Sequence, residues 1–329
     1  MAQTKSEVAD SHWSSVRKVV RKPEDNFFED YPTVNEFRKS MLNMAGSGSR
    51  EIQIGLMSSG GTAASFDKYD VLDKTPINPY ESAFYQRRYY AIPIILSDTE
   101  NWENQGPERI FDLLKGLGDN ADSSLLKAIN EDIWSAQAGK NMLGFQDHMA
   151  TSAGATVGGI DSSASTFWES QRDTASKTFT AQTVTNIFDG VQAWNDINED
   201  IAIQGGRVSH IFTTWAIAKA YRETVSSAGY ARTELKNPSG VGTGAGQGIP
   251  DFYDAKIIAD NDAVASASYH VDKRTLKLET LKQANFKKTP FVSLQSNGQL
   301  AQLAYKIASV QLSNNNRRRN GVKTALTGS

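Results

Sequence analysis

Residues 51–102 constrain the fold more than any other part of the sequence, because they contain two extended runs with little between them to form a core. The first run is EIQIGLM (51–57), and the second is AFYQRRYYAIPIILSDTE (83–100), which is rich in aromatic and β-branched residues. Glycine, proline and asparagine interrupt the connecting segment. The pattern predicts a long hairpin. Since two strands cannot bury enough apolar surface to be stable alone, the hairpin has to lie on another surface.

From Pro107 the spacing of the apolar residues becomes that of a helix. Apolar side chains recur at three- and four-residue intervals as far as about Ala138, which predicts a helix over 107–138. If unbroken, it would be roughly 45–50 Å long. Gly116 and Gly118 leave a second interpretation open, in which they divide it into two shorter helices.

The second half of the chain mixes helices and strands without a regular repeat. Apolar spacing predicts helices over 181–197 and 215–225. Runs of β-branched and apolar residues predict strands at 207–214, 253–260 and 266–272, and further strands within 275–312. The fold class is therefore expected to be α+β. The 45–49 segment, AGSGS, is a flexible joint by composition, and residues 1–49 read as an arm rather than a domain.

The charge is unevenly distributed, although the net charge is only −2. Residues 1–22 carry five basic and two acidic residues, and residues 313–329 carry four basic residues and no acid. Basic ends on an acidic body can bind nucleic acid or the body of a neighbouring copy, or they can be solvated tails. We expect the basic tail, with Arg317, Arg318 and Arg319, to take one of these three roles.

The composition excludes several classes of protein. There is no cysteine, which excludes disulfides and cysteine-ligated zinc. The longest apolar run, AIPIIL (91–96), is far shorter than the ~20 residues of a membrane span. The N-terminus lacks the apolar stretch of a secretory signal, so synthesis in the cytoplasm and no membrane partner are expected.

A search for catalytic, cofactor or metal sites predicts none. The four histidines are scattered singly without metal-ligand spacing. The glycine-rich GTGAGQG (242–248) lacks the spacing of a dinucleotide or phosphate loop and is not followed by a helix start. We therefore expect no catalytic residue, no cofactor, no metal and no enzyme activity.

The stretch TVGGIDSSASTFWESQ (156–171) combines glycine, serine and aromatic residues. A serine hydrolase needs G-x-S-x-G, and no second glycine follows Ser162 or Ser163. A structural role fits better: the glycines provide a tight turn, and Trp168 supplies a contact at a strand edge.

This stretch resembles a GGI-polar-Ser-x-x-x-aromatic-Trp signature found in many major capsid proteins of tailed bacteriophages. The order of the surrounding segments is also similar, and so are the closing runs YHVDKRTLKLE and FVSLQSNGQLAQLAYKIASVQL. The resemblance implies the Hong-Kong-97-type fold. It would comprise an N-terminal arm (1–50), an E-loop (51–102), a peripheral P domain with a spine helix (103–180), an axial A domain (181–267), returning P-domain strands (268–312) and a basic tail (313–329).

The resemblance further implies a virion protein that assembles as hexamers and pentamers into an icosahedral shell around double-stranded DNA. Its partners would be other copies of itself, the packaged DNA through non-specific electrostatics, a portal, a scaffold and a decoration protein. Aromatic and arginine residues are enriched at protein interfaces, so we expect interface contacts from Tyr85, Arg87, Arg88, Tyr89, Tyr90 and Trp168.

Three alternatives remain at this point. An encapsulin-type nanocompartment shell would share the fold but enclose enzymes instead of a genome. A serine hydrolase would use Ser162 or Ser163. A DNA-binding regulator would need a basic recognition helix, which the sequence does not contain.

Overall fold

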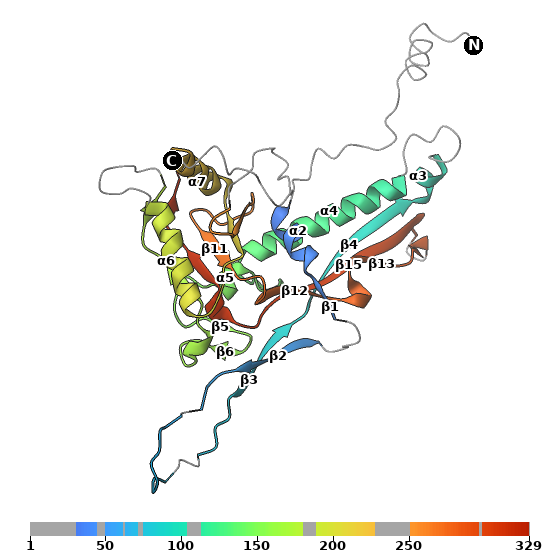
Figure 1. Cartoon of the computed structure of the whole chain (residues 1–329). Helices are drawn as coiled ribbons and strands as arrows, with labels where there is room; N and C mark the ends of the chain where they lie inside the picture. The colour runs from blue at the N-terminus through green and yellow to red at the C-terminus, as the bar shows by residue number, and fades with distance from the viewer. Residues whose placement is uncertain are drawn as a thin grey trace, which may run out of the picture. The chain divides into compact units, whose positions relative to one another are not determined.

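The computed structural model describes residues 31–44, 50–61, 63–71, 75–103, 113–179, 189–227, 251–295 and 298–328. They form two compact units. Figure 1 shows the helices and strands of the chain with their labels. The smaller unit takes its described residues from Ala91–Leu125 and Phe286–Ile307. The larger unit takes them from Asp30–Tyr90, Leu126–Asn285 and Ala308–Ser329. Helix α4 (Leu113–Trp134) and strands β4 (Arg88–Ser97) and β15 (Ala301–Asn314) contribute residues to both.

The larger unit contains a five-stranded sheet with the order β10-β9-β11-β16-β7. Its strands are β10 (Lys256–Ala259), β9 (His210–Thr213), β11 (Ser268–Val271), β16 (Gly321–Lys323) and β7 (Gln171–Asp173). β9 is parallel to β10 and antiparallel to β11, whereas β16 is antiparallel to β11 and parallel to β7. A strand from the end of the chain therefore lies between two strands that precede it by many residues.

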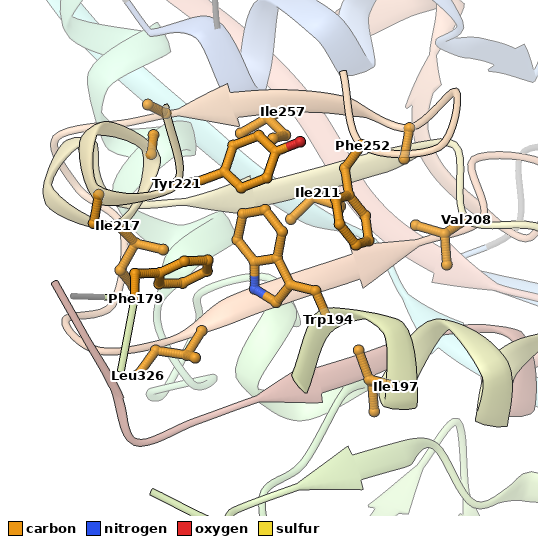
Figure 2. Packing of buried hydrophobic residues seen from close by; sticks show 14 of the residues in the cluster. Phe179, Trp194, Ile197, Val208, Ile211, Ile217, Tyr221, Phe252, Ile257 and Leu326 are labelled. Atoms are coloured by element: carbon orange, nitrogen blue, oxygen red, sulfur yellow. The ribbon is translucent and has the colours of Figure 1, made fainter. Parts of the chain in front are cut away.

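Helices α6 (Asp189–Ile203) and α7 (Trp215–Ser227) pack on this sheet, α6 against β16 and β7 and α7 against β10. Trp194 of α6 is fully buried at the centre of an apolar cluster (Figure 2). The rings of Phe179 and Phe252 meet its indole edge-on, with centroid distances of 5.1 and 5.3 Å. Ile197 and Ile201 follow on the same buried face, as the three- and four-residue spacing requires.

A second sheet in the larger unit contains β1 (Leu42–Met44), β12 (Leu276–Leu281) and the last residues of β15. β1 is parallel to β12, and β12 is antiparallel to β15. Helix α2 (Pro32–Lys39) precedes β1 and is held by Phe37, whose ring stacks on Phe212 with a centroid distance of 5.5 Å.

Glu36 of α2 adds a dense set of charge contacts. Its carboxylate lies within 4 Å of His210, Lys39, Lys256 and Lys273. The hydrogen bond from His210 and those from the ammonium groups hold the pKa of Glu36 far below its usual range, against the effect of burial. This helix is thus fixed by both an aromatic contact and an ionic cluster.

The strands of the smaller unit are arranged around β15. β13 (Lys287–Lys288) and β14 (Val292–Ser293) are antiparallel to it, and β4 pairs with it as well. Helix α3 (Asp98–Glu103) follows β4. The Lys306 ammonium of β15 lies 2.9 Å from the Asp122 carboxylate of α4.

Most predicted elements are confirmed within a few residues, among them α7, β9, β10 and β11. The helix predicted over 107–138 is continuous over Leu113–Trp134, and residues 104–112 lie outside the described residues. Gly116 and Gly118 do not divide it. A Cβ added at either position would meet no atom within 4 Å, so the glycines cost helix propensity without disturbing packing. The described part of α6 begins at Asp189, within the helix predicted over 181–197, and residues 180–188 lie outside the described residues.

The prediction of a basic tail at 313–329 is wrong for the described residues. After β15 the chain forms a 3₁₀ turn, η4 (Arg317–Arg319), and then enters the five-stranded sheet as β16. β17 (Leu326–Thr327) pairs in parallel with β8 (Lys177–Thr178). The buried side chains of Val322 and Leu326 hold this segment in the larger unit.

Candidate functional site

The clearest candidate for a functional site is the long hairpin of the larger unit. β2 (Glu51–Met57) and β3 (Tyr80–Gln86) pair antiparallel, with Ile52 opposite Tyr85 and Ile54 opposite Ala83. Figure 1 shows the hairpin extending away from the sheets of this unit. Because successive side chains of a strand point to opposite faces, one face of the hairpin is apolar and buried and the other is exposed.

The buried face lies on the glycine-serine-tryptophan stretch. There, β5 (Thr156–Val157) and β6 (Ile160–Asp161) form a two-stranded hairpin around Gly158 and Gly159. One apolar cluster joins the two hairpins and consists of Ile52, Leu56, Ala83, Tyr85, Val157, Ile160 and Trp168. The buried face of the long hairpin therefore packs on the signature stretch.

Gly158 is required at the closest point of this contact. Its carbonyl accepts a hydrogen bond from the Phe84 amide at 2.9 Å. Its φ of +62° lies in the left-handed region, and an added Cβ would lie 2.9 Å from the Cβ of Ala83. Gly159 has a φ of +81°, but an added Cβ would meet nothing within 4 Å. Of these two glycines, Gly158 alone combines a conformational and a steric requirement for glycine.

Trp168 stabilises the glycine-serine-tryptophan stretch that supports the hairpin. It ends the 3₁₀ turn η1 (Thr166–Trp168), is only 1% exposed, and donates from its indole Nε1 to the Val157 carbonyl at 2.9 Å. Since the indole is both packed and hydrogen-bonded, its orientation is determined.

The side chain of Arg317 stabilises the same region through hydrogen bonds to its main-chain carbonyls. Its guanidinium is 1% exposed and donates from Nε to the His148 carbonyl at 2.9 Å. Nη1 donates to the carbonyls of Trp168 and Ala155 at 3.1 and 3.3 Å, and Nη2 donates to the Asp147 carbonyl at 3.2 Å. Burial lowers the pKa of Arg317 to about 10, so it stays charged at neutral pH.

Two tyrosines, one on β3 and one at the start of β4, connect this part of the chain to the rest of the larger unit. The Tyr85 hydroxyl donates to the Asn314 carbonyl at 2.8 Å. The Tyr90 hydroxyl, at the start of β4, donates to the Asp132 carboxylate at 2.5 Å and accepts from the Met142 amide at 3.1 Å. Burial raises the pKa of both hydroxyls above the ordinary tyrosine value.

The residues predicted for an interface differ in their exposure. Tyr85 and Trp168 lie in the subunit's own core, which corrects their expected place on the surface. Tyr89 is 59% exposed, and Arg88 and Tyr90 are half-buried. Arg87 is buried at the base of the hairpin.

The three arginines predicted as a basic tail are not equivalent. Arg317 is a core residue, whereas Arg318 and Arg319 are half-buried. The roles proposed for all three in a solvated or DNA-binding tail therefore do not apply to Arg317.

Sequence reasoning missed a set of exposed apolar residues along the hairpin, of which Tyr69 and Val71 are the most exposed large apolar side chains that the structure describes. Tyr69 is 94% exposed, and six more large apolar side chains of the hairpin are exposed: Met57, Phe66, Val71, Ile77, Tyr80 and Phe84. Apolar residues inside a segment rich in glycine and proline were the available signal. So many exposed large apolar side chains on one segment favour a site of protein contact.

The serines of the signature stretch are not arranged for catalysis. The Ser162 hydroxyl is buried and donates to the Ala155 carbonyl at 3.0 Å, and the Ser163 hydroxyl donates to the Asp161 carboxylate at 2.8 Å. Among the described residues, no histidine is hydrogen-bonded to either serine. The hydrolase interpretation therefore lacks the base that would activate its nucleophile.

The described residues contain no group of three or more histidine, aspartate or glutamate side chains placed to hold a metal ion. None of their helices combines the length and the apolar composition needed to cross a membrane.

Comparison with known proteins identifies the fold. No family model and no curated protein matches the sequence. Among solved structures, the chain is similar to the capsid asymmetric unit of cyanophage A-1(L), with 15% identity, a TM-score of 0.67, and 95% of this chain and 97% of that chain covered.

Two further capsid structures give similar results. The capsid of the native GTA particle matches with 10% identity and a TM-score of 0.66, covering 99% of this chain and 100% of that chain. The capsid of Myoviridae phage XM1 matches with 11% identity and a TM-score of 0.63, covering 95% and 98%. The chain is thus a mixed helix-and-sheet protein with the fold of phage capsid proteins.

Proposed function

We propose that this chain is the major capsid protein of a tailed bacteriophage, which assembles as hexamers and pentamers into an icosahedral shell around double-stranded DNA. The observation that carries the proposal is the match, over nearly the whole length of both chains, to the capsid structures of two phages and of a GTA particle. No substantial part of the chain is left over for another function. The role is structural, without enzyme activity, and its location is the virion.

The Hong-Kong-97-type domain plan is part of the proposal. We assign the arm to residues 1–50, the E-loop to 51–102, the P domain to 103–180 and 268–312, and the A domain to 181–267. The paired strands β2 and β3 support an E-loop, and α4 supports a spine helix. The α6 and α7 cluster on the five-stranded sheet supports an A domain with a core of its own, although β16 and β7 of that sheet come from outside 181–267.

The hairpin gives the physical reason for self-association. Its buried face is held to the subunit by the cluster around Tyr85 and Trp168, while its loop exposes several large apolar residues. A stable monomer normally avoids such exposure, and a neighbouring copy can cover it. Head-to-tail contacts of this kind close into rings, and many weak contacts together stabilise a shell.

The other partners follow from the same proposal. Packaged DNA would be contacted by basic residues through counterion release, without sequence preference. A portal, a scaffold and a decoration protein would complete the particle.

Electron microscopy of the purified protein, expressed with the phage assembly genes, tests the proposal directly. We expect multi-megadalton icosahedral particles that contain nuclease-protected DNA. A wild-type protein that stays monomeric would contradict the proposal, and particles containing enzymes instead of DNA would identify a nanocompartment.

A second preparation tests the role of the hairpin loop. It carries Phe66→Ser and Tyr69→Ser, and its matched control carries Ser59→Thr and Ser65→Thr at two exposed positions of the same loop. The first variant should remain folded and assemble poorly, because it removes apolar surface that a neighbouring copy would cover. The control should assemble normally. Equal assembly of the two variants would show that the loop does not contribute to the shell.

A further inference from the structure

Four basic side chains of the larger unit surround a single carboxylate, that of Glu36 in α2. The ammonium groups of Lys39, Lys256 and Lys273 lie 2.8, 3.3 and 2.7 Å from its oxygens, and the His210 imidazole lies at 3.4 Å. These five residues form the lysine cluster. With His210 counted as neutral, three ammonium groups face one carboxylate, so the lysine cluster has more positive than negative charge.

The fold brings the lysine cluster together from separate segments. Lys39 is the last residue of α2, while His210 and Lys256 are register partners on the parallel strands β9 and β10. Lys273 follows β11, and its main-chain amide donates to the Ser209 hydroxyl, which also contacts the His210 ring. The sheet and α2 therefore determine where the basic groups lie.

Solvent reaches the basic groups of the lysine cluster. The Lys39 side chain is 51% exposed, and those of Lys256 and Lys273 are 21% and 18% exposed. Among the described residues, the Lys39 and Lys256 ammonium groups hydrogen-bond only the Glu36 carboxylate, so each keeps two N–H donors. A ligand can therefore approach from solvent and find donors that no protein group occupies.

The positive charge of the lysine cluster is not fully compensated within the subunit. Ammonium groups that share one carboxylate repel one another, and a further anion would relieve this repulsion. Asp251 is a second acidic group nearby: burial raises its pKa, and Lys256 and His210 oppose that rise. In the part of the chain that the structure describes, its carboxylate forms no ion pair with either side chain. Even with Asp251 counted, one positive charge remains in excess.

We propose that the lysine cluster is a phosphate-binding site, with Lys39 and Lys256 as its main ligands. A phosphate group suits it because several oxygens can accept from several ammonium donors at once. Lysine binds such a group as a point charge, without the planar bidentate geometry of arginine. Two sources supply this chemistry, the free ion and the backbone of DNA. The DNA source rests on the proposed function, whereas the phosphate chemistry does not.

The first experiment compares the denaturant midpoint of the unassembled subunit in inorganic phosphate and in sodium chloride of equal ionic strength. Phosphate should raise the wild-type midpoint, because a ligand that binds only the folded state stabilises it. Phosphate also stabilises proteins in general through exclusion from their surface, so variants have to be compared.

The increase in midpoint should shrink about threefold or more in the double variant Lys39→Gln/Lys256→Gln, which lacks both main ligands. The matched control is Lys219→Gln, which changes an exposed lysine of α7 that pairs with Glu223. It should keep the wild-type increase. Equal increases in the wild type and the double variant would overturn the proposal, because only the general effect of phosphate would then be present.

Glu36→Gln should act in the opposite direction. It removes the carboxylate that competes with phosphate for the ammonium groups, so the dissociation constant for inorganic phosphate should fall about fivefold or more. If the lysines serve only to hold Glu36, the variant should be less stable and gain no affinity for phosphate. The double lysine variant still decides the proposal if Glu36→Gln does not fold.

A second experiment separates the two sources of phosphate. Subunits are titrated with a random-sequence double-stranded oligonucleotide at several salt concentrations. If DNA is the source, the double variant should bind about tenfold more weakly, and its salt slope should be smaller by about two. Unchanged DNA binding together with a lost phosphate effect would assign the site to the free ion.

Assembly provides the remaining readout. A double variant that assembles poorly, in a protein that phosphate does not stabilise specifically, would assign the lysine cluster to an acidic group of another copy and overturn the proposal. If the wild-type protein does not assemble at all, the proposed function fails, while the phosphate titration of the free subunit still decides whether the site exists.

Discussion

The guanidinium of Arg317 donates a hydrogen bond of 3.1 Å to the carbonyl of Trp168, although 149 positions separate the two residues in the sequence. Trp168 in turn donates to Val157, which lies in the apolar cluster beneath the long hairpin. A residue near the end of the chain therefore stabilises the support of a hairpin formed near its beginning.

Arg317→Met should lower the free energy of unfolding by about 3–5 kcal/mol, because four main-chain carbonyls lose a buried charged donor at once. Denaturant unfolding measures the effect. Arg318→Met is the matched control on the same 3₁₀ turn and should change the free energy by less than about 1 kcal/mol. Equal effects at the two positions would show that the Arg317 contacts contribute little.

Gly158→Ala should destabilise the protein more than Gly159→Ala. Both substitutions force alanine into a left-handed conformation, at a cost of about 1–2 kcal/mol. Only Gly158→Ala also places a methyl group 2.9 Å from the Cβ of Ala83, so the hairpin has to move away from the β5–β6 stretch on which it packs. Thermal unfolding of the two variants, together with proteolysis of the hairpin loop, compares them. The Gly158 interpretation fails if the two variants unfold and are cleaved alike.

Trp168→Ala should lower the free energy of unfolding by ~3–5 kcal/mol, because a fully buried indole leaves a large cavity. Trp168→Phe retains an aromatic ring but loses the donor to the Val157 carbonyl, and its cost should be smaller. The exposed Trp102 provides the control, since Trp102→Ala should have little effect. A Trp168→Ala protein as stable as the Trp102→Ala protein would refute the buried role.

Acid should destabilise the protein through two buried histidines. Burial lowers the pKa of His148 and of His270 from 6.5 to about 3. Their folded-state pKa values are depressed, so the stability they allow is fully present above pH 6.5 and is lost as the pH falls from there towards 3. Each histidine contributes a slope of about 1.4 kcal/mol per pH unit over this window.

His148→Gln tests this slope, because glutamine can still donate to the Leu312 carbonyl that His148 Nε2 contacts at 3.1 Å. Unfolding free energies at pH 7, 6 and 5 should fall less steeply for the variant than for the wild type. Parallel curves for the two proteins would mean that His148 is not held neutral by the fold.

The sequence predicted the parts of the fold that depend on local periodicity. The long helix, α7, β9 and the extended runs of the hairpin all follow from the spacing of apolar residues over short windows. The structural interpretation of the signature stretch follows from local features too, because Gly158 provides a tight turn.

The rest depends on contacts between distant segments. Three consecutive arginines usually mark a solvated surface, and nothing local shows that four carbonyls from residues 147–168 converge on one of them. The buried Val322 and Leu326 beyond the arginines were the only local sign that the chain continues into a core. Tyr85 and Trp168 have the composition of interface residues for the same reason that they suit a core, since both environments favour large aromatic groups.

The position of β16 between β11 and β7 has a consequence for synthesis on the ribosome. The five-stranded sheet cannot close, and Arg317 cannot reach the carbonyls of residues 147–168, until residues 317–323 have left the exit tunnel. A nascent chain that stops earlier contains the hairpin but lacks the Arg317 hydrogen bonds that complete its support. Translation itself thus separates the moment at which the hairpin exists from the moment at which it is held in a fixed orientation.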